Sequence, residues 1–236
     1  MPNRVVYAIK RRIVPGFRPR RADLVVDIGS GDKPFWRADV LVDSIAAGDE
    51  QRHSGRPVET RLGAFVESDV TRGLPFANGA FDFSYCSHLL EHLPAPGAFL
   101  EELARVSRAG YIEVPNGMYE VAEPFVSHLW LVFRDGERLV FVRKSKAMHD
   151  ALHRNRASHS GLRFRVLREP FIRLYWEGSV DYEIVDELSA EQRYDVGPES
   201  VPSSEPRDEF PRVYAWSVRL LRRAFRRHQA PSALDG

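Results

Sequence analysis

The chain has a single cysteine, Cys86, among its 236 residues. One cysteine excludes an internal disulfide and is typical of a reducing compartment. We interpret Cys86 as a packed small side chain rather than a nucleophile. No Cys/His group has the spacing of a zinc site, so the sequence predicts no bound metal.

The chain also lacks a run of about 18 apolar residues, the length that a transmembrane helix requires. Its N-terminal residues lack the apolar core of a secretory signal. Hydrophobic residues make up 43% of the chain and charged residues 28%. This composition supports a sizeable core and a soluble protein, so we expect a cytoplasmic location.

The chain has almost no excess of one sign of charge, because Lys and Arg number 34, Asp and Glu number 33, and the formal net charge is +1. We therefore expect no nucleic-acid partner. Basic residues do gather at residues 1–21 and in 213–236, where an apolar stripe at helical spacing predicts a basic amphipathic helix. Such a helix either docks on the domain or makes weak peripheral contact with an anionic membrane. The oligomeric state stays open.

The most informative segment of the chain is the mostly apolar run at residues 24–28, which is followed directly by Gly29-Ser30-Gly31. The run has the composition of a buried parallel strand. The two glycines allow a tight turn and a close approach to a ligand. The third glycine of the dinucleotide pattern is missing, with Lys33-Pro34 near its place. A ligand with a ribose and no phosphate therefore fits better than a dinucleotide.

Acidic residues close the next two predicted strands. Asp43 follows the apolar run 40–42, sixteen residues after Asp27, and Asp69 follows 65–68. A carboxylate at the tip of the second strand can accept hydrogen bonds from both ribose hydroxyls. The alternative is an ordinary aspartate in a turn.

These features together resemble the class I S-adenosylmethionine-dependent methyltransferases. The resemblance covers about residues 22–116. The motifs that carry it are 27–31, Asp43, Asp69, 74–76 and 81–82, and the segments 87–93 and 102–106 are similar to the branch called methyltransferase type 11.

The resemblance implies S-adenosyl-L-methionine as the cofactor. It implies that the glycine turn lies against the methionine part of the cofactor and that Asp43 holds the ribose. It also implies that Asp69 and Val70 lie on either side of the adenine, and that the end of the fourth strand lies beside the sulfonium. The short first crossover departs from the family pattern, and Lys33 is a candidate partner for the cofactor carboxylate. The candidate cofactor-binding residues are Asp27, Gly29, Ser30, Gly31, Lys33, Asp43, Ser44, Asp69, Val70, Tyr85 and Ser87.

The resemblance also implies an α/β fold, a doubly wound and mostly parallel seven-stranded sheet of the Rossmann-like methyltransferase type. We expect this domain at 22–190, with an inserted cover at about 117–165. A fourth strand at 81–85 and a helix at 96–107, ended by basic residues and Gly110, are predicted from the residues themselves.

Two later segments are predicted to form hairpins. One centres on Asp135-Gly136, and the other joins 171–176 to 180–185. We assign the second pair to strands six and seven of the sheet. Residues 191–212, rich in Pro, Ser and Glu, are predicted to form a mobile loop.

The predicted function is methyl transfer to a small molecule or glycan, with oxygen favoured as the acceptor atom. A hydroxyl acceptor needs a proton acceptor, for which His88 and His128 are the candidates. Each could equally be a buried, hydrogen-bonded imidazole.

His149 and His153 share a helix face and could bind a metal, although solvated histidines explain them as well. The alternatives are a non-catalytic cofactor-binding module and, less favoured, a nicotinamide-dependent oxidoreductase.

Overall fold

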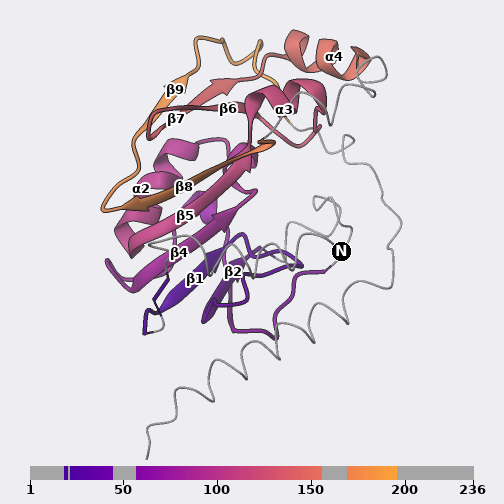
Figure 1. Ribbon diagram of the computed structural model, residues 1–236. Coiled ribbons are helices and arrows are strands. Elements are labelled where there is room, and N and C mark those ends of the chain that lie inside the picture. Colours follow the sequence, from indigo (N-terminus) through magenta and orange to yellow (C-terminus); the bar gives the residue numbers. More distant parts are fainter. Residues whose placement is uncertain (1–18, 21, 45–56, 156–168, 196–236) are drawn as a thin grey trace, which may run out of the picture.

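The computed structural model describes residues 19–20, 22–44, 57–155 and 169–195 (Figure 1). The predicted C-terminal helix and almost all of the basic N-terminal segment lie outside these residues, as does the predicted mobile loop from residue 196 onward. Within the described part, no helix is long and apolar enough to cross a bilayer.

A six-stranded sheet forms the centre of the molecule, in the order β3-β2-β1-β4-β5-β8 (Figure 1). The first five strands of this order are parallel, and β8 is antiparallel to β5. The mostly parallel, Rossmann-like fold is thereby confirmed. The strands are β1 (Val25–Ile28), β2 (Val40–Asp43), β3 (Ala64–Glu67), β4 (Phe81–Ser87), β5 (Ser107–Pro115) and β8 (Phe171–Glu177).

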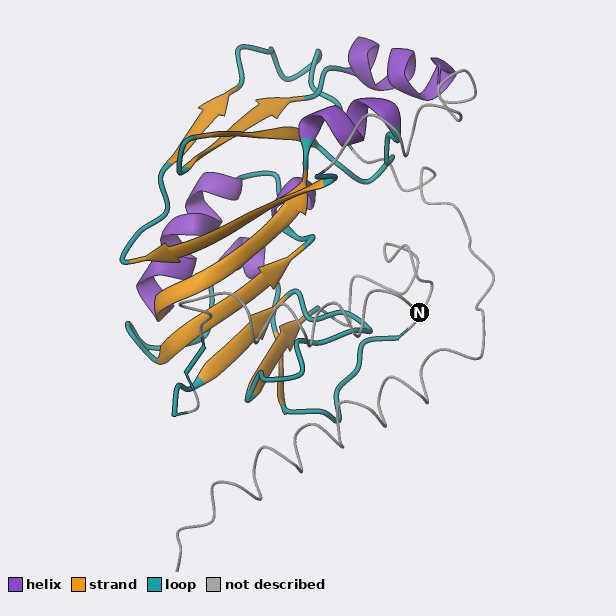
Figure 2. Cartoon of the chain, in the orientation of Figure 1, coloured by secondary structure: helices purple, strands orange, loops and turns teal. Residues whose placement is uncertain are grey.

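One face of this sheet packs against helix α2 (Pro96–Val106) (Figure 2). The helix begins with a proline at its first turn, where the missing N–H costs nothing. Its apolar stripe, which includes Leu100 and Leu103, is buried on the sheet residues Val26 and Ile112. The 3-10 turn η3 (Leu90–His92) precedes it on the same side, and η2 (Val70–Arg72) follows β3. This core fixes the positions of the strand ends.

The predicted end of α2 is wrong. The helix stops at Val106 and β5 begins at once, so Gly110 is a strand residue and not a helix cap. A Cβ at Gly110 would lie 2.7 Å from the Ser84 carbonyl oxygen and 2.7 Å from Trp176 Nε1. Close packing between neighbouring strands therefore explains this glycine.

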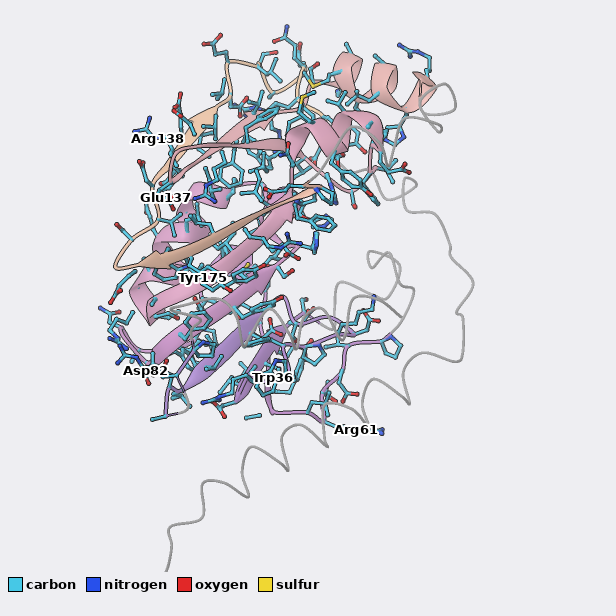
Figure 3. The ribbon with its side chains drawn as sticks, viewed as in Figure 1. Trp36, Arg61, Asp82, Glu137, Arg138 and Tyr175 are labelled. Atoms are coloured by element: carbon cyan, nitrogen blue, oxygen red, sulfur yellow. The ribbon has the colours of Figure 1, made fainter. Side chains whose placement is uncertain are left out.

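A second, smaller sheet is made of β6 (Trp130–Asp135), β7 (Arg138–Arg143) and β9 (Tyr182–Val185). The predicted Asp-Gly hairpin is confirmed as the β6–β7 pair, with Glu137 in its turn and Arg138 at the start of β7 (Figure 3). Helices α3 (Gly117–Ala122) and α4 (Lys146–Asn155) lie beside this sheet (Figure 2).

The assignment of residues 171–185 to two strands of the main sheet is wrong in part. Only β8 joins it, which leaves six strands where seven were predicted. Strand β9 pairs in parallel with β7 instead. Asp181 holds this pairing in place: its carbonyl accepts the Leu139 N–H at 3.0 Å, and its carboxylate lies 3.2 Å from Arg138 Nε.

Candidate functional site

The glycine turn after β1 is fastened to the neighbouring strand β2. Gly29 and Gly31 have φ values of +74° and +53°, a region that disfavours residues with a Cβ. The amides of Gly29 and Ser30 both donate to the Val42 carbonyl, at 2.9 and 3.2 Å. Ser30 is buried, and its Oγ has no hydrogen-bond partner within the described part of the chain. The turn therefore presents a polar group that a ligand can satisfy.

Asp43 ends β2 directly beside this turn. Its Oδ2 accepts the Gly31 amide at 2.7 Å, and its Oδ1 accepts the Ser44 amide at 2.8 Å. Each carboxylate oxygen has a second lone pair, so the group can still accept bonds from a diol. Lys33, two residues after the turn, is exposed. These residues form a polar edge at the carboxyl ends of β1 and β2, where doubly wound sheets bind ligands.

Asp27 lies deeper than the other acids and is 1% exposed. Burial raises its pKa to about 7, even though the Phe35 amide donates to its Oδ2 at 2.6 Å and so opposes the shift. The nearby charge of Asp43 raises the pKa further. Asp27 therefore organises the segment after the glycine turn through the Phe35 amide.

Asp69 caps the 3-10 turn η2 beyond the end of β3. Its Oδ1 accepts both the amide and the hydroxyl of Thr71, at 3.0 and 2.7 Å, and these bonds lower its pKa. Val70 is the half-buried first residue of η2. The strands that lead to the three acids are neighbours in the order β3-β2-β1, so the acids gather at one edge of the sheet.

The tip of β4 continues the same edge. Tyr85 lies opposite Asp27 in the β1–β4 register and stacks on Phe35, with ring centroids 4.4 Å apart. Ser87 ends the strand, with its Oγ 3.5 Å from Glu113 Oε1. The glycine turn touches this tip as well, because a Cβ at Gly29 would lie 3.1 Å from the Leu89 side chain.

His88 has a positive φ of 57°, the only such value for a non-glycine residue in the described ranges. Its Nδ1 lies 3.3 Å from Glu91 Oε1, and its Nε2 lies 3.5 Å from Glu113 Oε1. Burial lowers the pKa of His88, but the bonds to Glu113 and Glu91 outweigh it and raise the pKa to about 9. His88 is therefore a cation at neutral pH, held between two carboxylates.

His128, from the loop before β6, is 3% exposed and lies on the other side of Glu91. Its Nδ1 is 2.7 Å from Glu120 Oε2, and its Nε2 is 4.0 Å from Glu91 Oε1. The fully buried Lys144, just after β7, pairs with the other oxygen of Glu120. The two predicted histidines, far apart in sequence, thus share one carboxylate.

Glu91 is the centre of this charged cluster and is 1% exposed. Burial alone would raise its pKa, but a hydrogen bond from His88 and the charges of the surrounding histidines lower it to about 2. Glu113 has the same balance, with its pKa also lowered to about 2 against the effect of burial. Arg173 Nε donates to Glu113 Oε2 at 2.7 Å. Both glutamates are therefore charged at neutral pH.

Five of these residues were not predicted from sequence as parts of a site. They lie on separate elements, with no motif spacing between them: Glu91, Glu113, Glu120, Lys144 and Arg173. The sequence around Glu120 and Lys144 has no pattern that predicts the burial of these two charged side chains against each other. A polar residue inside an otherwise apolar strand, as Glu113 is in β5, was the one available signal.

Comparisons with known proteins find similarity to methyltransferases over part of the chain. Residues 40–112 match the family model of a methyltransferase domain. An uncharacterized methyltransferase of Mycolicibacterium gilvum (strain PYR-GCK) is 30% identical over 129 residues, which is 48% of this chain and 48% of that protein. The chain thus spans about half the length of this curated relative.

Parts of two solved structures are also similar to this chain, at low identity. An S-adenosylmethionine-dependent methyltransferase from Thermotoga maritima is 18% identical, with 48% of this chain and 53% of that chain covered and a TM-score of 0.36. One from Mesorhizobium loti is 14% identical, with 61% and 66% covered and a TM-score of 0.36.

Proposed function

We propose that this chain is a class I S-adenosylmethionine-dependent methyltransferase that methylates an oxygen of a small molecule or glycan, and the match of residues 40–112 to the family model of a methyltransferase domain supports this proposal. The observation that supports this most directly is the Gly31–Asp43 contact of 2.7 Å. It joins the glycine turn of β1 to the acidic tip of β2, at the edge where such sheets bind nucleosides.

The residues at this edge fit the proposed cofactor. Gly29 and Gly31 keep the turn free of side chains, and the buried Oγ of Ser30 offers a hydrogen-bonding group to the amino-acid part. Asp43 would hold the ribose, assisted by Ser44. The remaining proposed contacts are Asp27 through the turn it organises, Lys33 to the carboxylate, Asp69 and Val70 around the adenine, and Tyr85 and Ser87 toward the sulfonium.

The charged cluster supplies the groups that an acceptor hydroxyl requires. When bound, S-adenosyl-L-methionine supplies an electrophilic methyl carbon. Glu120 accepts a hydrogen bond from Nδ1–H of His128, so the neutral imidazole has its lone pair on Nε2, and we assign proton acceptance from the hydroxyl to this atom. His88 is already protonated at neutral pH, and we assign it to holding the acceptor by charge and hydrogen bonding at the tip of β4.

Calorimetry with Asp43→Asn tests the cofactor assignment. We expect the variant to bind S-adenosyl-L-homocysteine roughly 10–100-fold more weakly, because hydrogen bonds to a charged group contribute about 1.5–3 kcal/mol. Asp82→Asn is the matched control. Asp82 also accepts a backbone amide, that of Leu24, but it lies at the opposite end of β4 (Figure 3).

The same titrations decide between the proposed function and its alternatives. Preference for NAD over S-adenosyl-L-methionine would overturn the methyltransferase assignment in favour of an oxidoreductase. Cofactor binding without methyl transfer to a panel of hydroxyl compounds and glycans would instead support a binding module. Methyl transfer that persists unchanged in His128→Asn would reject His128 as the proton acceptor.

A further inference from the structure

Three side chains of the charged cluster converge in a way that the assigned roles do not explain. Glu91, His92 and His128 each place one potential ligand atom so that all three atoms lie within 4.8 Å of one another. We propose that these residues bind a divalent transition-metal ion of the Zn²⁺ type. The ligands would be a carboxylate oxygen of Glu91 and the Nε2 atoms of His92 and His128.

Hydrogen bonds on the far side of each imidazole orient both rings for this role. His92 Nδ1 lies 3.0 Å from the Ser127 carbonyl oxygen, and His128 Nδ1 lies 2.7 Å from Glu120 Oε2. Both acceptors lack a proton to donate, so each Nδ1 is the donor, and in the neutral form of each ring, the form that binds a metal, the lone pair lies on Nε2. A carbonyl or carboxylate behind a histidine is the usual outer shell of a protein metal site.

Glu91 provides the negative charge that an ion needs. Its Oε1 lies 4.0 Å from Nε2 of His92 and 4.0 Å from Nε2 of His128. Its Oε2 is buried and has no hydrogen-bond partner within the described ranges. A buried carboxylate oxygen without a partner is costly, and coordination to a cation removes that cost.

The donor types select the class of ion. Two imidazole nitrogens and one carboxylate oxygen suit Zn²⁺ and its first-row neighbours, whereas Mg²⁺ and Ca²⁺ favour all-oxygen sets. Ligands of tetrahedral zinc, with bonds of about 2.0–2.1 Å, lie roughly 3.3 Å apart. The observed 4.0 Å separations therefore need to shorten by less than about 1 Å. The His92 side chain is 26% exposed, which gives the ion a route from solvent.

This proposal does not rest on methyl transfer. A bound ion occupies the Nε2 lone pair of His128, so the proton acceptance that we assign to this atom belongs to the ion-free chain. Binding of the ion can be measured without cofactor or acceptor, and its failure leaves the cofactor assignment untouched.

The experiment uses the full chain, freed of metal with a chelator and then titrated with Co²⁺. We expect a visible absorption band that saturates at a single ion per chain, and its displacement by Zn²⁺. His92→Phe should abolish the band, since it keeps a ring against His128, whose centroid lies 4.7 Å away, but removes the nitrogen. Glu120→Gln should weaken Co²⁺ binding about 10–100-fold through loss of the outer shell.

The matched control is His153→Phe, which alters the other neighbouring histidine pair, His149 and His153, with ring centroids 4.4 Å apart. It should leave the Co²⁺ titration unchanged, and circular dichroism should show that all variants are folded. The proposal is overturned if the chain shows no Co²⁺ band. It is also overturned if His153→Phe removes the band while a folded His92→Phe keeps it.

Discussion

The two halves of the candidate site are built by different means. The half at β1, β2 and β3 is made by consecutive strand ends, and its contacts join side chains to backbone amides over short stretches of chain, as Gly31 and Asp43 do. The half around Glu91 is made by single residues from η3, β5, α3 and the segments beside β4, β6 and β7, and its contacts are ion pairs among mostly buried groups. The first half depends on backbone geometry and the second on charge balance.

The largest effect is expected when the charge balance is broken at Lys144. Lys144→Met leaves Glu120 buried with its ammonium partner removed, which typically costs about 3–5 kcal/mol in the free energy of unfolding. Urea denaturation measures this loss. Lys146→Met, at an exposed position two residues later, should change stability by no more than about 0.5 kcal/mol.

The double variant Lys144→Met/Glu120→Met sharpens this test. Replacing both members of a buried pair by apolar residues is often neutral, but Glu120→Met also removes the partner of His128 Nδ1 and of the Phe125 amide, so we expect only part of the lost stability to return. A double variant that regains none of it would show that the bonds to His128 and Phe125 matter more than the charge balance with Lys144.

The backbone-dependent half should respond more weakly, and through conformation. Gly29→Ala places a Cβ at φ +74° and 3.1 Å from Leu89, so we expect a loss of about 1–3 kcal/mol. Gly79→Ala is the matched control, because its φ is +65° but a Cβ there has nothing within 4 Å. Thermal unfolding of both variants separates the close contact from the backbone strain. Equal losses would show that Leu89 gives way.

The pH dependence of the free energy of unfolding tests the ion pairs of His88, which lies between the two halves of the site. Its pKa is raised from 6.5 to about 9, so its contribution to stability is fully present below about pH 6.5 and is lost as pH rises through 9. The wild-type chain should therefore lose stability between pH 7 and pH 10, by no more than about 1 kcal/mol because the His88 side chain is 41% exposed. His88→Asn should lack this decrease. An identical decrease in the variant would assign it to another group.

The smallest effect is expected at the contact between β9 and α2. The Tyr182 hydroxyl donates to Glu101 Oε1 at 2.9 Å on the surface, so Tyr182→Phe should cost about 0.5–1 kcal/mol. Chemical denaturation of the two proteins measures the difference. A larger loss would mean that the small sheet depends on this hydroxyl for its place.

The same contrast explains what could be predicted from sequence. The strand at 25–28, its glycine turn and the acid at Asp43 were predictable, because a buried run, a turn and a strand end are all encoded within a few residues. Gly110 was misread as a helix cap, because its reason lies across the sheet at Trp176. Nothing in the local sequence of β9 distinguishes pairing with β8 from pairing with β7.

The charged half was only partly predictable. His88 and His128 were recognised as reactive residue types, but the sequence could not show that Glu91 joins them. Lys144 is the clearest case: a lysine at a strand end is normally solvated, and only the position of Glu120 on α3 makes its burial acceptable.

The backbone of η3 is tied directly to the start of the small sheet. The Glu91 carbonyl accepts the Leu129 amide at 2.8 Å, and the Leu93 carbonyl accepts Trp130 Nε1 at 2.8 Å. A graft that transplants the small sheet between relatives must therefore begin upstream, at Leu89. A chimera joined after α2 would take η3 from one protein and its hydrogen-bond partners Leu129 and Trp130 from another.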